Sequence, residues 1–377
     1  MKIGIDVSFL DRDKRGMGRV TRALLEIMLA SSEHEYYFIM PFHRKDEPKI
    51  AKIFSPRRIE FLQTDENSLK ELDVVWYPWN RVDFYPSCKR VVSIYDVAPY
   101  RFTSKIKQDG FRDRKRLRSS CDSADVIITS SEFSKLEIMT FLDIPKEKIV
   151  VIGLGVDEQF QPSSGEGESS FLNFFSDGLP YVFFVGSVEK RKNLEVLLAG
   201  FDEAKRKYNI PHNLLIAGSS PKELASKAGK NLFDNITGLI TKKKPEPIVS
   251  TFNKLEFKDS VKWLGEVSDR DLVNLYAFSS LFVFPSLYEG FGIPLLEAFA
   301  SGVPALVSDI PVFREIALDS AYYFDCRDKS DLAAKMTRIL TDPEVVAQLK
   351  IKAFERLKDF SWEKSAMKHI KVLEGSL

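Results

Sequence analysis

The chain has 377 residues, with 55 Lys and Arg against 54 Asp and Glu, and its formal net charge of +1 gives no overall attraction to nucleic acid. That length allows two domains, because one hydrophobic core rarely grows past roughly 250 to 300 residues. Three widely spaced cysteines indicate no disulfide framework and favour a reducing cytoplasm, and four scattered histidines indicate no metal site. No apolar run approaches the roughly 18 residues of a membrane span.

Apolar runs of strand length alternate with helical patterns along the whole chain. This order predicts an α/β fold of two successive units with mainly parallel sheets. The first expected strand follows Met1 directly, with no signal peptide before it. In the first half of the chain, strands are expected near residues 2–7, 36–41, 73–77, 90–94, 125–129 and 148–152. In the second half, strands are expected near residues 181–186, 213–217, 260–264, 281–285, 303–307 and 321–324.

Two stretches interrupt this alternation. Residues 161–178 are polar and glycine-rich at their start and predict a linker between the two halves. Residues 218–247 contain the run TKKKPEP and predict a surface insertion.

Two glycines follow the first expected strand. Gly16 and Gly18 open a predicted helix, where free backbone N–H groups can receive a phosphate. Thr21 stands where a dinucleotide-binding fingerprint needs its third glycine, which argues against an NAD-dependent oxidoreductase. The residues alone support a plain tight turn as well as they support phosphate binding.

Aromatic residues gather at the end of the strand expected near residues 73–77 and just past it: Trp76, Tyr77, Trp79 and Tyr85. Such a cluster is more often core than a platform for sugars, and both interpretations are open. The next strand leads into Tyr95 and Asp96. Asp96 fits either a capped turn or a contact with the substrate.

The segment from residue 101 to 118 contains eight Lys or Arg residues and two acids, a balance of eight minus two, or plus six. A solvated helix face is the ordinary explanation of such a run. The alternative is docking on anionic lipid headgroups, which attract each nearby basic residue by about 1 kcal/mol.

In the second half, Arg191 and Lys192 come just after the strand expected near residues 181–186, at the expected start of a helix. Basic residues oppose the helix dipole there and are better placed to pair with phosphate.

The stretch from Leu281 to Ser308 combines a buried strand, a glycine turn and a helix that begins near Pro294, which is a geometry that binds anions. Glu289 in the turn and Glu297 in the first helical turn would flank a ligand whose phosphates rest on the turn. A nucleoside diphosphate sugar has this shape. The alternative is that both glutamates are solvent-facing acids.

The run from Glu289 to Glu297 resembles the signature of glycosyltransferase family 4, a Glu, seven residues and a second Glu around a Gly-Phe-Gly turn. The resemblance implies a GT-B fold, with two doubly wound Rossmann-like domains facing a central cleft. It places an acceptor-binding domain at residues 1–160, with residues 361–377 crossing back to it, and a nucleotide-sugar-binding domain at residues 179–360.

The same resemblance implies the roles of individual residues. The catalytic set would be Asp96, Arg191, Lys192 and Glu289, in which the two basic residues hold the diphosphate and Glu289 holds the sugar hydroxyls. Donor-binding residues would be Gly16, Gly18, Arg19, Gly186, Ser187, Val267, Gly290, Phe291, Gly292 and Glu297, with Glu297 on the ribose and the Val267 backbone on the base. Tyr95 replaces the family's usual histidine beside Asp96, so a catalytic histidine is not available there.

The resemblance further implies glycosyl transfer with retention of configuration, without a metal or cofactor. The cysteine usage favours a cytoplasmic protein, and the basic segment at residues 101–118 leaves peripheral contact with the inner face of the membrane open. The Gly-Met-Gly-Arg turn and residues 308–317 look most like the mannosyltransferase branch of bacterial polysaccharide synthesis, which implies GDP-mannose as donor and a glycan or lipid-linked glycan as acceptor. UDP-glucose and UDP-N-acetylglucosamine are alternative donors. A sugar-nucleotide-binding assembly partner without catalytic activity is the alternative from another class of protein.

Overall fold

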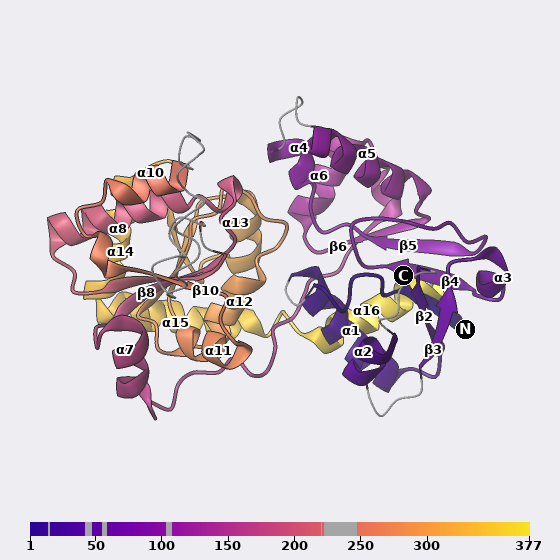
Figure 1. Cartoon of the computed structure of the whole chain (residues 1–377), viewed down its shortest axis with the longest axis horizontal. Helices are drawn as coiled ribbons and strands as arrows, with labels where there is room; N and C mark the ends of the chain where they lie inside the picture. Colours follow the sequence, from indigo (N-terminus) through magenta and orange to yellow (C-terminus); the bar gives the residue numbers. More distant parts are fainter. Residues whose placement is uncertain (14–15, 42–46, 55–58, 103–107, 220, 222–246) are drawn as a thin grey trace, which may run out of the picture. The chain divides into compact units, whose positions relative to one another are not determined.

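The computed structural model describes residues 1–13, 16–41, 47–54, 59–102, 108–219, 221 and 247–377. These residues form two compact units, of which the first comprises Met1–Asp157 with Phe360–Leu377 and the second Glu158–Asp359 (Figure 1). Most of the predicted insertion at residues 218–247 lies outside the described residues, as do Lys105 and Lys107 of the basic segment.

In the first unit, the described residues form a parallel sheet of seven strands in the order β3-β2-β1-β4-β5-β6-β7. The strands are β1 Lys2–Asp6, β2 Glu35–Met40, β3 Glu60–Gln63, β4 Val74–Tyr77, β5 Lys89–Ser93, β6 Val126–Thr129 and β7 Ile149–Val151. Six of them confirm the sequence prediction. The seventh, β3, was not predicted because it is a short edge strand whose residues are only partly buried, so no apolar run marks it.

Helices cover both faces of this sheet. They are α1 Met17–Ser31, α2 Glu47–Ile53, α3 Glu66–Leu69, α4 Ala98–Phe102, α5 Gln108–Ser123, α6 Glu132–Leu142 and α16 Trp362–Glu374. The last helix, α16, returns to the first unit and packs against α1. Ser361 caps it by accepting a hydrogen bond from the Lys364 N–H at 3.2 Å. The backbone of Trp362 also lies so close to Gly155 that a Cβ there would meet its nitrogen at 2.3 Å, which explains the glycine.

In the second unit, the described residues form a parallel sheet of six strands in the order β10-β9-β8-β11-β12-β13. The strands are β8 Tyr181–Gly186, β9 Asn213–Gly218, β10 Val261–Gly265, β11 Leu281–Phe284, β12 Ala305–Ser308 and β13 Tyr322–Phe324, all of which were predicted. The helices are α7 Glu168–Ser176, α8 Leu194–Tyr208, α10 Pro247–Asn253, α11 Asp269–Ala277, α12 Ile293–Ala300, α13 Pro311–Ala317, α14 Lys329–Thr341 and α15 Pro343–Leu357.

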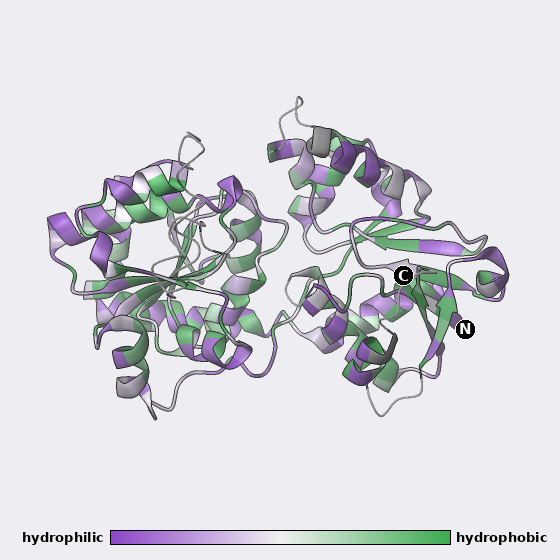
Figure 2. Cartoon of the chain, in the orientation of Figure 1, coloured by the Kyte–Doolittle hydropathy of each residue, from purple (hydrophilic) through white to green (hydrophobic). Residues whose placement is uncertain are grey.

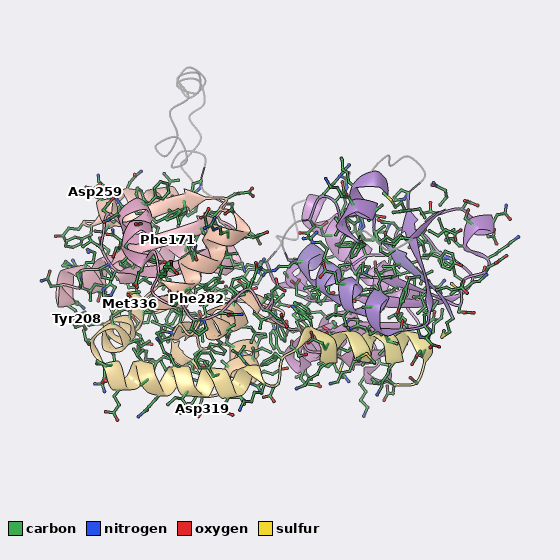
Figure 3. The ribbon with its side chains drawn as sticks, turned by 90° about the horizontal axis from the view of Figure 1, so that it is seen from below. Phe171, Tyr208, Asp259, Phe282, Asp319 and Met336 are labelled. Carbon is green, nitrogen blue, oxygen red and sulfur yellow. The ribbon has the colours of Figure 1, made fainter. Side chains whose placement is uncertain are left out.

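The second core has two faces because successive strand residues point to opposite sides of the sheet. One face packs against α8, α10 and α14, where Met336 is fully buried. The other packs aromatic rings against α11, since Tyr276 contacts both Phe183 and Phe282 at ring distances of 5.0 and 5.3 Å. Figure 2 shows the strands largely in hydrophobic colours, and Figure 3 labels Phe282 and Met336 within the second unit.

The predicted linker at residues 161–178 is partly wrong, because α7 occupies Glu168–Ser176 within it. Phe171 and Phe175 lie four positions apart on one side of this helix, and the Phe171 ring packs against Phe278 at 5.2 Å. The polar, glycine-rich start of the stretch concealed this short helical pattern.

Candidate active site

The candidate site lies where the strand order of the second sheet reverses. The central strand β8 has β9 on one side and β11 on the other, so the loops after β8 and β11 leave the same edge in opposite directions. Open α/β sheets bind ligands at such a switch point, at the carboxyl ends of the strands. The first loop carries Arg191 and Lys192, and the second carries Glu289.

These three side chains converge in a cluster of buried charges. Lys192 Nζ lies 2.6 Å from Glu289 Oε1, and Arg191 Nη1 lies 3.0 Å from Oε2. Ser286 Oγ donates a further hydrogen bond to Glu289 at 2.7 Å. Glu289 and Lys192 are each only 8% exposed, so their charges interact in a poorly hydrated setting.

Burial alone would raise the pKa of Glu289, but the positive charges of Lys192 and Arg191 and the hydrogen bonds outweigh it and hold the pKa below the ordinary value. Glu289 is therefore an anion at neutral pH. Two cations face this one carboxylate, and Arg191 also pairs with Glu189 at 2.8 Å, so the four charges balance. An anionic ligand could pair with the two cations in place of their carboxylate partners.

Two further residues build the cluster, and the sequence had not indicated them. Glu189 accepts a hydrogen bond from Arg191 Nε at 2.8 Å. Burial by itself would raise the pKa of Glu189, yet the Ser187 hydroxyl and Arg191 lower it. Asn193, at a positive φ of 57°, donates from Nδ2 to the carbonyls of Pro285 and Cys326 at 3.0 and 2.8 Å, and thereby ties the basic loop to the ends of β11 and β13.

The basic residues do not open the helix that was predicted for them. Residues Lys190–Lys192 form a separate 3₁₀ turn, and α8 begins only at Leu194. Asn193 in the left-handed region separates the two. The turn aims the basic side chains at Glu289, and the Arg191 carbonyl accepts from the Leu287 N–H at 2.7 Å, which joins the two loops.

The Gly290-Phe291-Gly292 turn leads into α12. Gly292 has a φ of 114° and precedes the first helical residue, with Pro294 in the first turn as predicted. The placement of Glu297 in the first turn is wrong by a small margin, because the helix already begins at Ile293 and makes Glu297 its fifth residue. Glu297 is 3% exposed, so it is not a solvent-facing acid.

Three other predicted donor contacts lie near strand ends of the second sheet. Gly186 ends β8, and Ser187 follows it. Val267 precedes Ser268, which caps α11 by accepting from the Asp271 N–H at 3.1 Å.

In the first unit, the glycine turn does open α1. Gly16 precedes the helix at a φ of 57°, and the Gly18 N–H donates to Asp13 at 3.0 Å. Arg19 forms an ion pair with Asp157, with Nε 2.7 Å from Oδ2. Contact between Arg19 and a donor phosphate remains a prediction.

Asp157 also accepts a hydrogen bond from Trp362 Nε1 at 2.9 Å. Its carboxylate therefore joins α1 and α16 within the first unit, since Arg19 belongs to α1 and Trp362 begins α16.

Asp96 takes the role of a turn cap, because its Oδ1 accepts from the Ala98 N–H at 2.9 Å. The aromatic cluster is mainly core: Trp76, Tyr77 and Trp79 are at most 3% exposed, whereas Tyr85 is 58% exposed. Tyr95, in the place of the family's histidine, is largely buried, and burial raises the pKa of its hydroxyl.

Comparisons with known proteins identify the family of this chain. The family model described as Glycosyl transferases group 1 matches residues 167–356. The O-antigen chain mannosyltransferase B of Escherichia coli is 27% identical over 277 residues, which cover 73% of this chain and 67% of that protein. The serotype-specific mannosyltransferase WbdA of Escherichia coli is 29% identical over 251 residues, 65% of this chain but only 28% of that longer protein.

Solved structures show the same fold. Anabaena Alr3699/HepE in complex with UDP and glucose matches with a TM-score of 0.75 over 100% of both chains at 13% identity. WaaG, a glycosyltransferase involved in lipopolysaccharide biosynthesis, matches with a TM-score of 0.71 over 99% of this chain and 100% of that chain, also at 13% identity. In the part of this chain that the structure describes, no helix has the length and apolarity to cross a membrane. The family match covers 190 of the 377 residues, and the chain therefore belongs to the group 1 glycosyl transferases, with the GT-B fold.

Proposed function

We propose that this glycosyltransferase moves mannose from GDP-mannose to a glycan or lipid-linked glycan, with retention of configuration and without a metal ion. The observation that carries the proposal is the buried cluster of Arg191, Lys192 and Glu289 at the switch point of the second sheet. The oxygens of a nucleoside diphosphate can pair with both cations in place of their carboxylate partners.

The chemistry follows from charge. As the bond between sugar and diphosphate breaks, negative charge grows on the diphosphate. Arg191 and Lys192 stabilise this charge, and Glu289 holds both cations in place before the donor arrives, so that little reorganisation is needed. The free N–H groups of the Gly290–Gly292 turn and of the start of α12 add partial positive charge.

Retention is explained by departure and attack on the same face of the sugar. The acceptor hydroxyl bonds to the anomeric carbon, the carbon–oxygen bond to the diphosphate breaks, and the proton of the hydroxyl passes to the departing diphosphate. This route needs no protein nucleophile. In the first unit, Asp96 orients the acceptor, and its hydrogen bond to Ala98 fixes the carboxylate for that task.

The choice of mannose rests on the relatives, since three that match are called mannosyltransferases: O-antigen chain mannosyltransferase B, WbdA, and RfbU of Salmonella typhimurium, which is 27% identical over 69% of this chain and 63% of that protein. UDP-glucose is the second candidate donor, because HepE was solved with UDP-glucose and has the same fold. At 13% identity that likeness concerns the fold alone.

The test is a thermal-shift series with GDP, UDP, ADP and their sugars, because a ligand that binds only the folded chain raises its stability. We expect a selective shift with GDP and GDP-mannose. A UDP-selective shift would replace the donor, and no shift with any nucleotide would contradict a sugar-nucleotide site. A shift without release of nucleotide, tested with an acceptor panel, would favour the non-catalytic binding partner.

The basic segment is proposed to dock on an anionic membrane at the inner face. In α5, Arg112, Lys115 and Arg116 are exposed, and Phe111 beside them is 62% exposed. Arg101 does not contribute freely, because it pairs with Glu137 at 2.6 Å. Flotation with vesicles that contain phosphatidylglycerol should exceed flotation with phosphatidylcholine alone. Equal flotation with both would remove the proposal.

A further inference from the structure

A concave surface lies in the second unit, between α7 and α11. It encloses about 940 Å³, at the upper end of the range for sites that bind small molecules. We call this surface the aromatic groove. None of the residues proposed to hold the donor lines it. Its lining residues are Gln159, Glu166, Gly167, Ser170, Phe171, Phe174, Phe175, Arg270, Asp271, Val273, Asn274 and Phe278.

Two helix faces build the groove. In α11, Arg270 and Asn274 are spaced four residues apart, and Phe278 follows after four more, so the groove runs along the length of that helix. In α7, the residues spaced by three and four from Phe171 are Phe174 and Phe175. Figure 1 shows α7 and α11 near one another, and the contact between Phe171 and Phe278 joins them.

Four phenylalanine rings form a connected surface in the groove. The Phe171 ring lies 4.5 Å from the Phe175 ring and 5.2 Å from the Phe278 ring, and the Phe174 ring lies 4.7 Å from the Phe175 ring. Phe174 is 79% exposed. A continuous aromatic surface that meets solvent marks a binding site more often than an isolated exposed ring does.

Polar groups surround these rings. Ser170, Arg270 and Asn274 bring a hydroxyl, a guanidinium and an amide to the same groove. A pyranose matches this combination, because its C–H groups can lie on the electron-rich face of a phenyl ring while its hydroxyls bond to the surrounding polar side chains.

The charge of the lining argues against an anionic membrane as the occupant. Two acids, Glu166 and Asp271, face one base, Arg270, a balance of minus one. Anionic lipid headgroups are repelled by such a lining, unlike the strongly basic α5 in the first unit. An uncharged oligosaccharide meets no such penalty.

We infer that the aromatic groove binds a neutral oligosaccharide, and that its ligand is the mannose-containing glycan that the enzyme extends. The identity of the sugar rests on the proposed function, whereas binding of a glycan rests on the groove itself. The groove holds part of the glycan away from the donor-binding residues. This contact keeps the growing product attached to the enzyme between transfers.

The test is binding of α-linked mannotetraose to the full chain, measured by calorimetry and by saturation-transfer NMR without nucleotide. Phe174→Ala should weaken binding about two- to twelvefold, since a stacked aromatic contributes roughly 0.5 to 1.5 kcal/mol beyond its buried area. Tyr208→Ala is the matched control, because Tyr208 is another exposed aromatic of the second unit, 47% exposed and outside the groove. Asn274→Ala is a second variant that removes a polar contact without touching the rings.

Equal binding by the wild type, Phe174→Ala and Asn274→Ala would overturn the inference, and so would absence of any oligosaccharide binding at millimolar concentration. Self-association of the wild type that Phe174→Ala abolishes, without glycan binding, would also overturn it and would assign the groove to a second copy. The thermal shift with GDP should be unchanged in Phe174→Ala. If mannotetraose binds but no nucleotide shifts the wild type, the proposed function fails while the groove stands.

Discussion

The carboxyl edges of the two sheets carry their polar residues in different ways. In the second unit, Arg191, Lys192 and Glu289 point at one another and bring two cations together around one buried carboxylate. In the first unit, the corresponding candidates complete the structure, because Arg19 pairs with Asp157 and Asp96 caps a turn. One edge brings buried side chains from two loops together, and the polar residues of the other edge connect its own turns and helices.

The strongest test of this difference is Lys192→Ala. We expect turnover to fall by about two to three orders of magnitude, because a charge partner of the transition state is lost from a poorly hydrated site. Lys190→Ala, an exposed neighbour in the same 3₁₀ turn, is the control and should retain turnover within a fewfold. Near-normal turnover of Lys192→Ala, with nucleotide release as the readout, would refute the role.

Glu289→Gln tests the cost of leaving the two cations without their carboxylate. Removal of one partner from a buried ion pair typically costs about 3 kcal/mol or more, so the free energy of unfolding of the second unit should fall by that amount. Glu355→Gln is the control, because Glu355 pairs with Lys358 at the surface and such pairs contribute less than about 1 kcal/mol. Urea unfolding of both variants measures the difference in their free energies of unfolding. Equal values would show that Glu289 does not stabilise the fold by balancing the two cations.

The first unit should respond less to an equivalent change. Asp157→Asn weakens the ion pair with Arg19, whose side chain is 21% exposed, and the expected loss is about 1 kcal/mol. Hydrogen exchange should increase in α1 and α16, which Asp157 joins through Arg19 and Trp362. A loss as large as that of Glu289→Gln would remove the distinction between the two edges.

A fall in pH should reduce the stability of the second unit more than that of the first. Burial lowers the pKa of His212 in the second unit, and of His369 in the first, to about 4. Each histidine therefore stabilises the fold fully above its unfolded pKa of about 6.5, and this contribution is lost as the pH falls from there towards 4.

In the first unit, burial raises the pKa of Asp6 to about 6. Between pH 6 and 4 the folded state then binds the Asp6 proton more readily than the unfolded state does, which offsets part of the loss from His369. Hydrogen exchange at pH 7, 5.5 and 4.5 should show the second unit opening first. His212→Gln should make the opening of the second unit less sensitive to acid. Opening of the first unit before the second would contradict the role of His212 in this acid response.

Most strands of the fold, but only some contacts of the candidate site, could be predicted from the sequence. Buried parallel strands leave continuous apolar runs, so strands such as β11 were predictable, whereas the exposed edge strand β3 left no such run. The meeting of Lys192 with Glu289 was predictable because both follow central strands whose carboxyl ends share one edge. Asn193 was not, since its role depends on a left-handed backbone and on carbonyls 92 and 133 residues away, which no local pattern reveals.

The most direct measurement is nucleotide release from GDP-mannose, UDP-glucose and UDP-N-acetylglucosamine by the wild type and Lys192→Ala, with a mannose-containing acceptor. We predict that, of the three donors, only GDP-mannose releases its nucleotide rapidly, and that this release requires the acceptor. The rate of release should fall by about two to three orders of magnitude in Lys192→Ala. Binding of GDP-mannose without any acceptor-dependent release, or equal release by wild type and variant, would contradict catalysis at the cluster of Arg191, Lys192 and Glu289.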